Sequence, residues 1–294
     1  MIFCTGCVSF IKDSIMSVTF HKNCIAMKKT FVILTTLCLS NMLFAQESYN
    51  PLSVRPVHPS DIMYQKTVTR AMDLREKQNE PLFSRNREIT ALLMDGVING
   101  IIKAYENDSL KTHVSVSDFL KKLTGPNTIS TEDTVDLFLE YGSDWKQIIA
   151  AMPVDQYAAR DLYQLEIKEC ILFDKQRSAL YYDIQTITVF IPADHPMNTR
   201  GIQIPVASFS YKEVAEKLFQ DNPKAIWYNT QNDRENKNLA DAFDLRLFSS
   251  YIIKVSNPKD AYLTDIYSDQ QKAIMASSWA ASTLMEYEHN LWEF

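Results

Sequence analysis

Paired carboxylates are the residues of this sequence whose type and spacing come closest to a catalytic site. Glycoside hydrolysis needs two carboxyl groups at a suitable separation, one of them to donate a proton. Asp133 and Asp136, or Glu286 and Glu288, are pairs of this kind. Because the chain has 36 acidic residues, some such pairs arise by chance. The presence of a pair therefore does not by itself indicate a catalytic site. A carboxylate-dependent glycan hydrolase remains the enzymatic alternative.

Histidine positions match no metal motif. None of His58, His113, His195 and His289 lies in a His-Glu-x-x-His sequence or beside a cysteine pair. Asp194 with His195 is the most metal-like pair, but a loop histidine next to an aspartate usually makes a local hydrogen bond. Glycine-rich phosphate loops and the Gly-x-Ser-x-Gly elbow of serine hydrolases do not occur either. We therefore expect no catalytic residue, no metal and no cofactor.

Four aromatic residues raise a second alternative, a glycan-binding module. They are Trp145, Trp227, Tyr228 and Trp279. Flat aromatic rings exposed together would form a platform for a sugar ring. Aromatic residues at these spacings more often belong to a hydrophobic core.

A helix is predicted between Ser60 and Pro81, and it contains the densest charged run of the chain. Pro56 and Pro59 keep the approach extended, Ser60 is a suitable cap, and Pro81 ends the segment. Apolar side chains recur on one face at Tyr64, Val68 and Ala71.

The charged run itself allows two interpretations. It comprises Arg70, Asp73, Arg75, Glu76 and Lys77. A solvated face with local salt bridges is one interpretation, and an assembly surface is the other, because arginine binds carboxylates bidentately and stacks on aromatic rings. We expect Arg70 and Arg75 to contact either a neighbouring subunit or a buried acidic partner.

The remaining pattern predicts an α+β fold. Helical spacing covers residues 88–105 and 117–123, whereas 127–152 is ambiguous between helix and strand. Alternation then predicts a long hairpin, with strands at 165–173 and 180–191. Further segments are a strand at 202–209, a helix at 211–219, a strand at 225–229, a surface loop at 230–238, and a helix leading into a strand over 240–255.

The expected architecture is a single domain over 46–294. It has a helical amino-terminal part at 60–152, a mainly antiparallel sheet with the long hairpin at 160–268, and a carboxyl-terminal helix at 269–294. The chain ends on aromatic residues, among them Trp292 and Phe294. These either dock onto their own domain or complete a partner's surface, since aromatics concentrate at interface cores.

The first 45 residues have the pattern of a leader. Residues 27–45 combine a positive start, an apolar run and a small residue at Ala45, which predicts a signal peptide cleaved after Ala45. Residues 1–26 are expected to be an over-extended gene prediction. A membrane anchor and a lipoprotein on Cys38 are weaker alternatives, because the apolar stretch is short. Cleavage would leave Cys170 as the one cysteine of the mature chain, expected as a small buried side chain.

Charge argues against nucleic acid as a partner. The leader holds four basic and one acidic residue out of 30 and 36, so the remaining chain has a net charge of −9. Nucleic acid and anionic membranes need a concentrated basic patch, and the sequence offers none. We expect neither nucleic-acid binding nor direct membrane insertion.

The stretch Arg55–Pro81 resembles the opening of the GldN/PorN family of gliding-motility and type IX secretion proteins. Asp73-Leu74-Arg75-Glu76-Lys77, followed by Asn79 and Pro81, forms the core of the likeness. Similar blocks follow in the same order at 102–110, 168–178, 248–260, 266–267 and 287–294. Thr69 departs from the tryptophan associated with the position before Arg70.

The resemblance implies a non-enzymatic protein of the periplasm. Members of this family are expected to assemble into rings with an outer-membrane lipoprotein, GldK/PorK, and to meet the periplasmic part of the GldM/PorM motor. Ring formation needs two complementary patches on each subunit. The charged run from Arg70 to Lys77, with Trp292 and Phe294, is the expected contribution to such interfaces.

Overall fold

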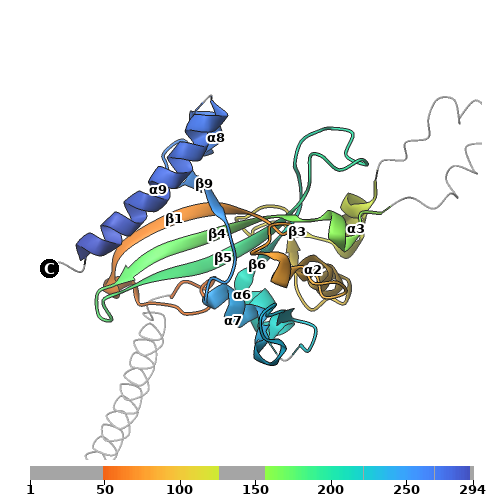
Figure 1. Cartoon of the computed structure of the whole chain (residues 1–294), viewed down its shortest axis with the longest axis horizontal. Helices are drawn as coiled ribbons and strands as arrows, with labels where there is room; N and C mark the ends of the chain where they lie inside the picture. The colour runs from red at the N-terminus through yellow and green to blue at the C-terminus, as the bar shows by residue number, and fades with distance from the viewer. Residues whose placement is uncertain (1–48, 126–155, 221, 268, 292–294) are drawn as a thin grey trace, which may run out of the picture. The chain divides into compact units, whose positions relative to one another are not determined.

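A seven-stranded antiparallel sheet organises the fold, in the order β3-β2-β6-β5-β4-β1-β9. The computed structural model describes residues 49–125, 156–220, 222–267 and 269–291 (Figure 1). The strands of this sheet are β1 (Ile62–Asp73), β2 (Ala104–Tyr105), β3 (His113–Val114), β4 (Gln164–Asp174), β5 (Ala179–Ile191), β6 (Ile204–Ser210) and β9 (Tyr251–Val255). A separate pair joins β7 (Ile226–Trp227) to β8 (Lys237–Asn238).

Helical segments lie between the strands and after them. The α-helices are α2 (Ile89–Ile98), α3 (Val116–Leu123), α6 (Tyr211–Glu213), α7 (Leu239–Asp244), α8 (Leu263–Ile266) and α9 (Gln270–Leu291). The π-helical η5 (Val214–Phe219) continues α6, and short 3-10 turns are η1 (Pro59–Asp61), η2 (Glu80–Leu82), η4 (Ala159–Asp161) and η6 (Asp233–Glu235). The α+β class and the antiparallel sheet are therefore confirmed.

The helix predicted after Ser60 is wrong, because this segment is strand β1. It pairs with β4 over Ile62–Asp73 and with β9 over Val68–Ala71. The β-branched residues Thr67, Val68 and Thr69 suit a strand, and long-range pairing on both sides outweighs the helical spacing of the apolar residues. Ser60 caps no helix. It donates its backbone N–H to the ring of His58 within η1. The amino-terminal part is thus only partly helical.

The long hairpin is confirmed in β4 and β5. The two strands pair from Gln164 with Phe190 to Asp174 with Ala179. Asp174 Oδ1 accepts hydrogen bonds from the backbone N–H groups of Gln176 and Arg177, which closes the turn between them. Aromatic and β-branched residues on both strands favour this extended pairing.

Helix α2 is shorter than the helix predicted over 88–105. It ends at Ile98, and Gly100 follows with φ of 69°, a left-handed conformation that suits glycine. Gly96 lets the chain approach closely, because a Cβ there would lie 3.0 Å from side-chain atoms of Ile102 and Leu218. Ala104 and Tyr105, at the end of the segment predicted as helix, form strand β2 instead.

Several other predictions are confirmed with shifted ends. The helix predicted at 117–123 is α3, with Ser115 as its cap, and the helix at 211–219 is α6 with η5. The predicted strand at 202–209 is β6, the helix and strand over 240–255 are α7 and β9, and the strand at 225–229 shrinks to β7. Segment 230–238 is a largely exposed connection that contains η6 and ends in β8. Most of the ambiguous region, 126–152, lies outside the described residues.

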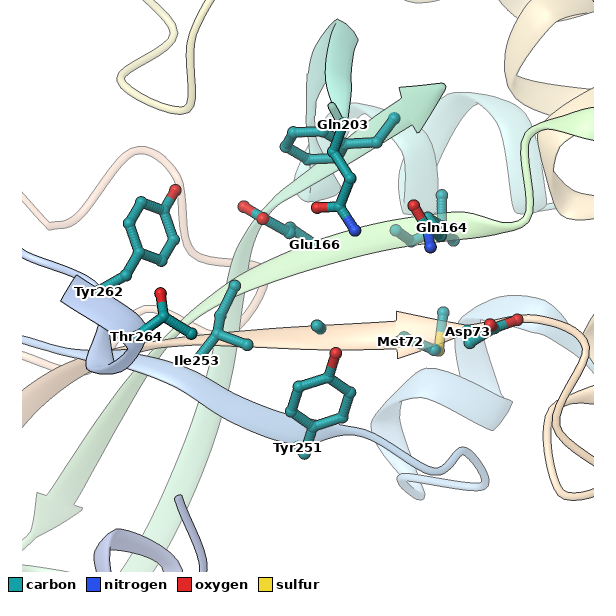
Figure 2. Close-up of a pocket in the computed structure, with 12 residues that line it drawn as sticks. Met72, Asp73, Gln164, Glu166, Gln203, Tyr251, Ile253, Tyr262 and Thr264 are labelled. Atoms are coloured by element: carbon teal, nitrogen blue, oxygen red, sulfur yellow. The ribbon is translucent and has the colours of Figure 1, made fainter. Parts of the chain in front are cut away.

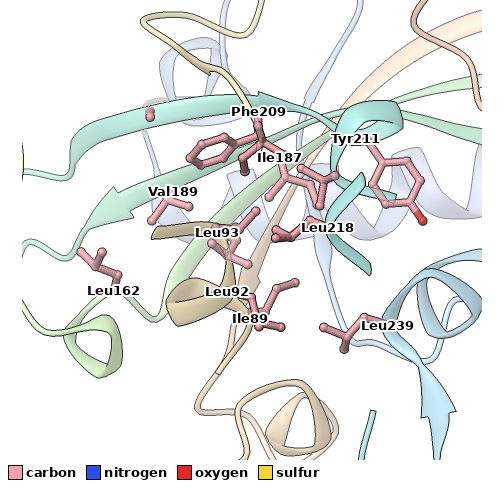
Figure 3. Close-up of a cluster of buried hydrophobic side chains, with 14 of the residues drawn as sticks. Ile89, Leu92, Leu93, Leu162, Ile187, Val189, Phe209, Tyr211, Leu218 and Leu239 are labelled. Atoms are coloured by element: carbon pink, nitrogen blue, oxygen red, sulfur yellow. The ribbon is translucent and has the colours of Figure 1, made fainter. Parts of the chain in front are cut away.

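The main core lies between the sheet and the helices α2, η5 and α7. Figure 3 shows Leu92 and Leu93 of α2 against Ile187 of β5, with Phe209 and Leu218 nearby. All are nearly inaccessible to solvent. Burial of such side chains contributes about 1.5–3 kcal/mol each, which makes this interface the main source of stability.

Helix α9 makes a second, smaller core at the β1–β9 edge of the sheet. Leu284 packs with Val68, Ile171 and Ile252. Figure 1 shows α9 running along β1, away from α2, α6 and α7. The predicted carboxyl-terminal helix is confirmed over Gln270–Leu291. Cys170 is buried, as expected.

Candidate functional site

The charged run divides between β1 and the turn that follows it. Arg70 lies within β1, Asp73 ends the strand, and Arg75 follows in the turn. Glu76 and Lys77 are exposed there. Trp292 and Phe294 lie outside the described residues. The structure therefore divides the run, because Arg70 makes one contact within the sheet and Asp73 with Arg75 makes another at the end of β1.

Arg70 contacts a buried acidic partner within its own chain. Its Nε donates to Oε1 of Glu169, whose side chain is fully buried. Arg246 donates from Nη1 to Oε2 of the same carboxylate at 2.7 Å. A buried carboxylate held by two guanidinium groups is expensive to break, because removing one partner leaves uncompensated charge in the interior. This contact fits one of the two possibilities expected for Arg70.

Arg75 makes a local contact at the surface. Its guanidinium lies 3.5 Å from the ring centroid of Tyr163, and its Nη2 is 2.9 Å from Asp73 Oδ2. Asp194 completes the group, 3.6 Å from Nη1, and accepts a hydrogen bond from the Tyr163 hydroxyl. Burial first, and then this hydrogen bond, raise the pKa of Tyr163 to about 12. The hydrogen bond from Tyr163 is also the main reason that the pKa of Asp194 is lowered.

His195 makes the local hydrogen bond expected of it. Its Nδ1 accepts from the backbone N–H of Met197 at 3.2 Å, and its Nε2 lies 3.6 Å from Asp161. Within the described part of the chain, no three acidic, histidine or cysteine side chains gather as metal ligands would.

Two adjoining cavities form a polar cleft that the sequence patterns did not indicate. Their volumes are about 450 and 570 Å³, and both are lined by Glu166, Phe190 and Tyr262. We call this hollow the Glu166 cleft. Figure 2 shows Glu166 of β4 between Gln203 and Tyr262, with Tyr251 on strand β9, beyond β1.

Strand alternation explains why Glu166 faces this cleft. Leu165 and Ile167 are buried in the main core, so the residue between them must point to the other face of the sheet. Its partners across the strands are Thr188 of β5 and Ala71 of β1. In the sequence, the one sign of this cleft is a charged residue between two apolar residues of a predicted strand.

Among the described residues, no cation forms an ion pair with Glu166. Burial first, and then the charge of Asp108, raise its pKa from 4.5 to about 7, while Lys254 acts in the opposite direction. Lys168 is already paired with Asp108 at 2.9 Å, and Lys254 with Asp260 at 2.6 Å. The lysines of the cleft are therefore committed to other carboxylates.

The described residues that raised the two carbohydrate alternatives have different surroundings. Trp227 packs against the main core, Tyr228 donates to Asp233 at 2.6 Å, and Trp279 lies on α9 with 68% of its surface exposed. Glu286 and Glu288 both lie on α9. Trp145, Asp133 and Asp136 lie outside the described residues.

The described residues form an α+β fold with a polar cleft in its sheet. The polar and aromatic side chains that line this cleft are suited to binding. The chain belongs to the GldN family, because the model of the family described as gliding motility associated protein GldN matches residues 57–293. This description names a motility component and no enzymatic activity. Curated protein sequences give no match to this chain. Of the helices in the described ranges, none is both long and apolar enough to cross a bilayer.

Proposed function

We propose that this protein is a structural subunit of the type IX secretion and gliding-motility apparatus. It assembles into rings with the outer-membrane lipoprotein GldK/PorK and contacts the periplasmic region of the GldM/PorM motor. The observation that carries the proposal is the family match over residues 57–293, which spans all of the described sheet and α9.

The proposed place of action is the periplasm, with export by the signal peptide at 27–45 and cleavage after Ala45. The expected chain then starts at Gln46, shortly before the described fold. Attachment to the outer membrane would come through the lipoprotein partner. Amino-terminal sequencing of protein from the periplasm tests this part of the proposal, since retention of Met27 or a lipid on Cys38 would contradict it.

Features of the described residues agree with a binding role. Exposed large apolar side chains on α9 include Ile274, Met275 and Trp279. Arginines, which favour interfaces, lie at Arg75 and at the exposed Arg85. No catalytic residue and no cofactor are assigned.

The decisive experiment mixes the chain from Gln46 with GldK/PorK in detergent and measures particle size by electron microscopy. The chain alone and the lipoprotein alone are the controls. Large rings found only in the mixture would support a scaffold that depends on the lipoprotein. Separate small particles in every sample would contradict ring assembly and turn attention to glycan binding and hydrolysis.

A further inference from the structure

The Glu166 cleft holds an amide and a carboxylate that lack a partner among the described residues. Gln164 and Glu166 lie two residues apart on β4, so their side chains share one face of the sheet (Figure 2). Gln164 Oε1 is buried and has no hydrogen-bond partner among the described residues. Glu166 is half-buried, and the lysines beside it pair with other carboxylates. A carboxylate that is partly withdrawn from water without an ion pair is costly to ionise, so it gains from a cation.

The cations around these acceptors are held elsewhere. Lys168 and Lys254 have their own carboxylates, as described above. Arg75 holds Asp73, the other acid that lines this part of the cleft. A cation for Glu166 must therefore come from outside the described chain.

Aromatic rings line the cleft near Glu166. Tyr251 of β9 is 56% exposed, and Phe190 of β5 and Tyr262 line the same cavity. Aromatic faces attract ammonium and guanidinium groups. The Tyr262 ring already lies 5.2 Å from Lys254 Nζ. The exposed ring of Tyr251 is the one that remains for an incoming cation.

We propose that the Glu166 cleft binds a lysine or arginine side chain on an extended segment of a partner polypeptide. The cation forms a charge-assisted hydrogen bond with Glu166 and packs against Tyr251. Arginine suits this arrangement best, because its planar guanidinium donates to both carboxylate oxygens and stacks on an aromatic ring.

The second cavity indicates a polypeptide rather than a free small cation. Beyond Glu166 the cleft continues over Thr186, Thr188 and Ser208. The exposed residues Asn107 and Ser109 form part of its wall, so an extended backbone next to the bound cation can lie along them. The inference does not depend on ring assembly, and its test needs no other component of the apparatus.

The test titrates the chain from Gln46 with a short Gly/Ser peptide that carries one central arginine, followed by NMR shifts. The same peptide with glutamine in place of arginine is the neutral control, and free arginine amide is the small-cation control. We expect the arginine peptide to bind more tightly than either control, with shifts at Tyr251 and Thr186.

Three protein variants complete the test. Glu166→Gln keeps the size of the side chain and removes its charge, so it should weaken arginine-peptide binding about tenfold. Glu235→Gln, on an exposed segment outside the cleft, changes net charge equally and should leave binding unchanged. Tyr251→Ala is the second cleft variant, because its exposed side chain tolerates truncation.

Three results would overturn the proposal. Equal binding of the neutral peptide would exclude cation recognition. Equal binding of free arginine amide would replace the polypeptide by a small cation. Binding that is absent, or that neither Glu166→Gln nor Tyr251→Ala weakens, would remove the cleft as the site.

Discussion

Arg246 holds Glu169 across the fold, with 2.7 Å between Nη1 and Oε2. Arg246 lies between α7 and β9 with φ of 54°, a conformation uncommon for residues other than glycine, whereas Glu169 lies in the middle of β4. Arg70 of β1 donates to the same carboxylate. One buried charge therefore ties two strands of the sheet to the segment that leads into β9.

Removing Arg70 should destabilise the fold strongly. Arg70→Ala leaves Glu169 with a single partner in the interior, which is expected to lower the free energy of unfolding by about 3 kcal/mol. Denaturant unfolding followed by circular dichroism measures this change. Arg177→Ala is the control, because Arg177 is exposed and lies 3.9 Å from its carboxylate. Similar midpoints for the two variants would show that the Glu169 contact contributes little.

The Arg75→Ala variant tests whether Arg75 contributes to ring assembly rather than to the stability of the fold. Arg75 is 52% exposed, so its ion pair and its contact with Tyr163 should contribute only about 0.5–1 kcal/mol to folding. If Arg75 belongs to an assembly surface, the variant should form fewer rings with GldK/PorK while unfolding nearly as the parent does. Arg85→Ala, another exposed arginine, is the matched control. Unchanged ring formation would remove Arg75 from the interface.

Stability should fall as pH rises through neutrality because of Glu166. Its folded pKa of about 7 lies above the ordinary value of 4.5, so the folded state holds the proton more tightly. This contribution is complete below about pH 4.5 and is lost as pH rises through about 7. One pKa unit corresponds to about 1.4 kcal/mol, and solvent access to the open cleft reduces the total.

The matching variant is Glu166→Gln. It should raise the free energy of unfolding by about 1–2 kcal/mol at pH 8 and have little effect at pH 4.5. Unfolding curves for both proteins at the two pH values test this. A gain that is equal at both pH values would mean that packing, rather than ionisation, is responsible.

The aromatic end of the chain can be tested in the same assembly assay. Combined Trp292→Ala and Phe294→Ala substitutions should reduce ring formation if these rings complete a partner's surface. Trp279→Ala, on the exposed side of α9, is the comparison. A lower unfolding midpoint for the double variant, with normal rings, would instead place the aromatic end on its own domain.

Local patterns predicted the elements whose partners lie close in sequence. The β4–β5 hairpin is such a case, because alternation and a short turn specify both strands. Strand β1 was missed because Tyr64, Val68 and Ala71 also fit a helix, and its partners in β4 and β9 are distant in sequence. The apolar residues of this segment fit both a helix and a strand, and only pairing with β4 and β9 in the assembled sheet decides between them.

The candidate site was harder to predict for the same reason. Arg70 and Glu169 are separated by 99 positions, so no local pattern pairs them. Glu166 was hidden among many carboxylates, although its place between Leu165 and Ile167 marks a charged residue in a core strand. Only the structure shows that the nearby Lys168 and Lys254 form ion pairs with other carboxylates and not with Glu166.

The two ends of the sheet limit how copies of this protein can join. At one end, β3 has two residues, and at the other, β9 has five and packs against α9. Short or covered edge strands offer little free backbone for another strand to add to. Growth by continuing the sheet from one copy to the next is therefore disfavoured. Contacts within the proposed ring would then depend on side-chain surfaces, whose geometry sets the rotation between neighbouring copies and so decides whether the ring closes.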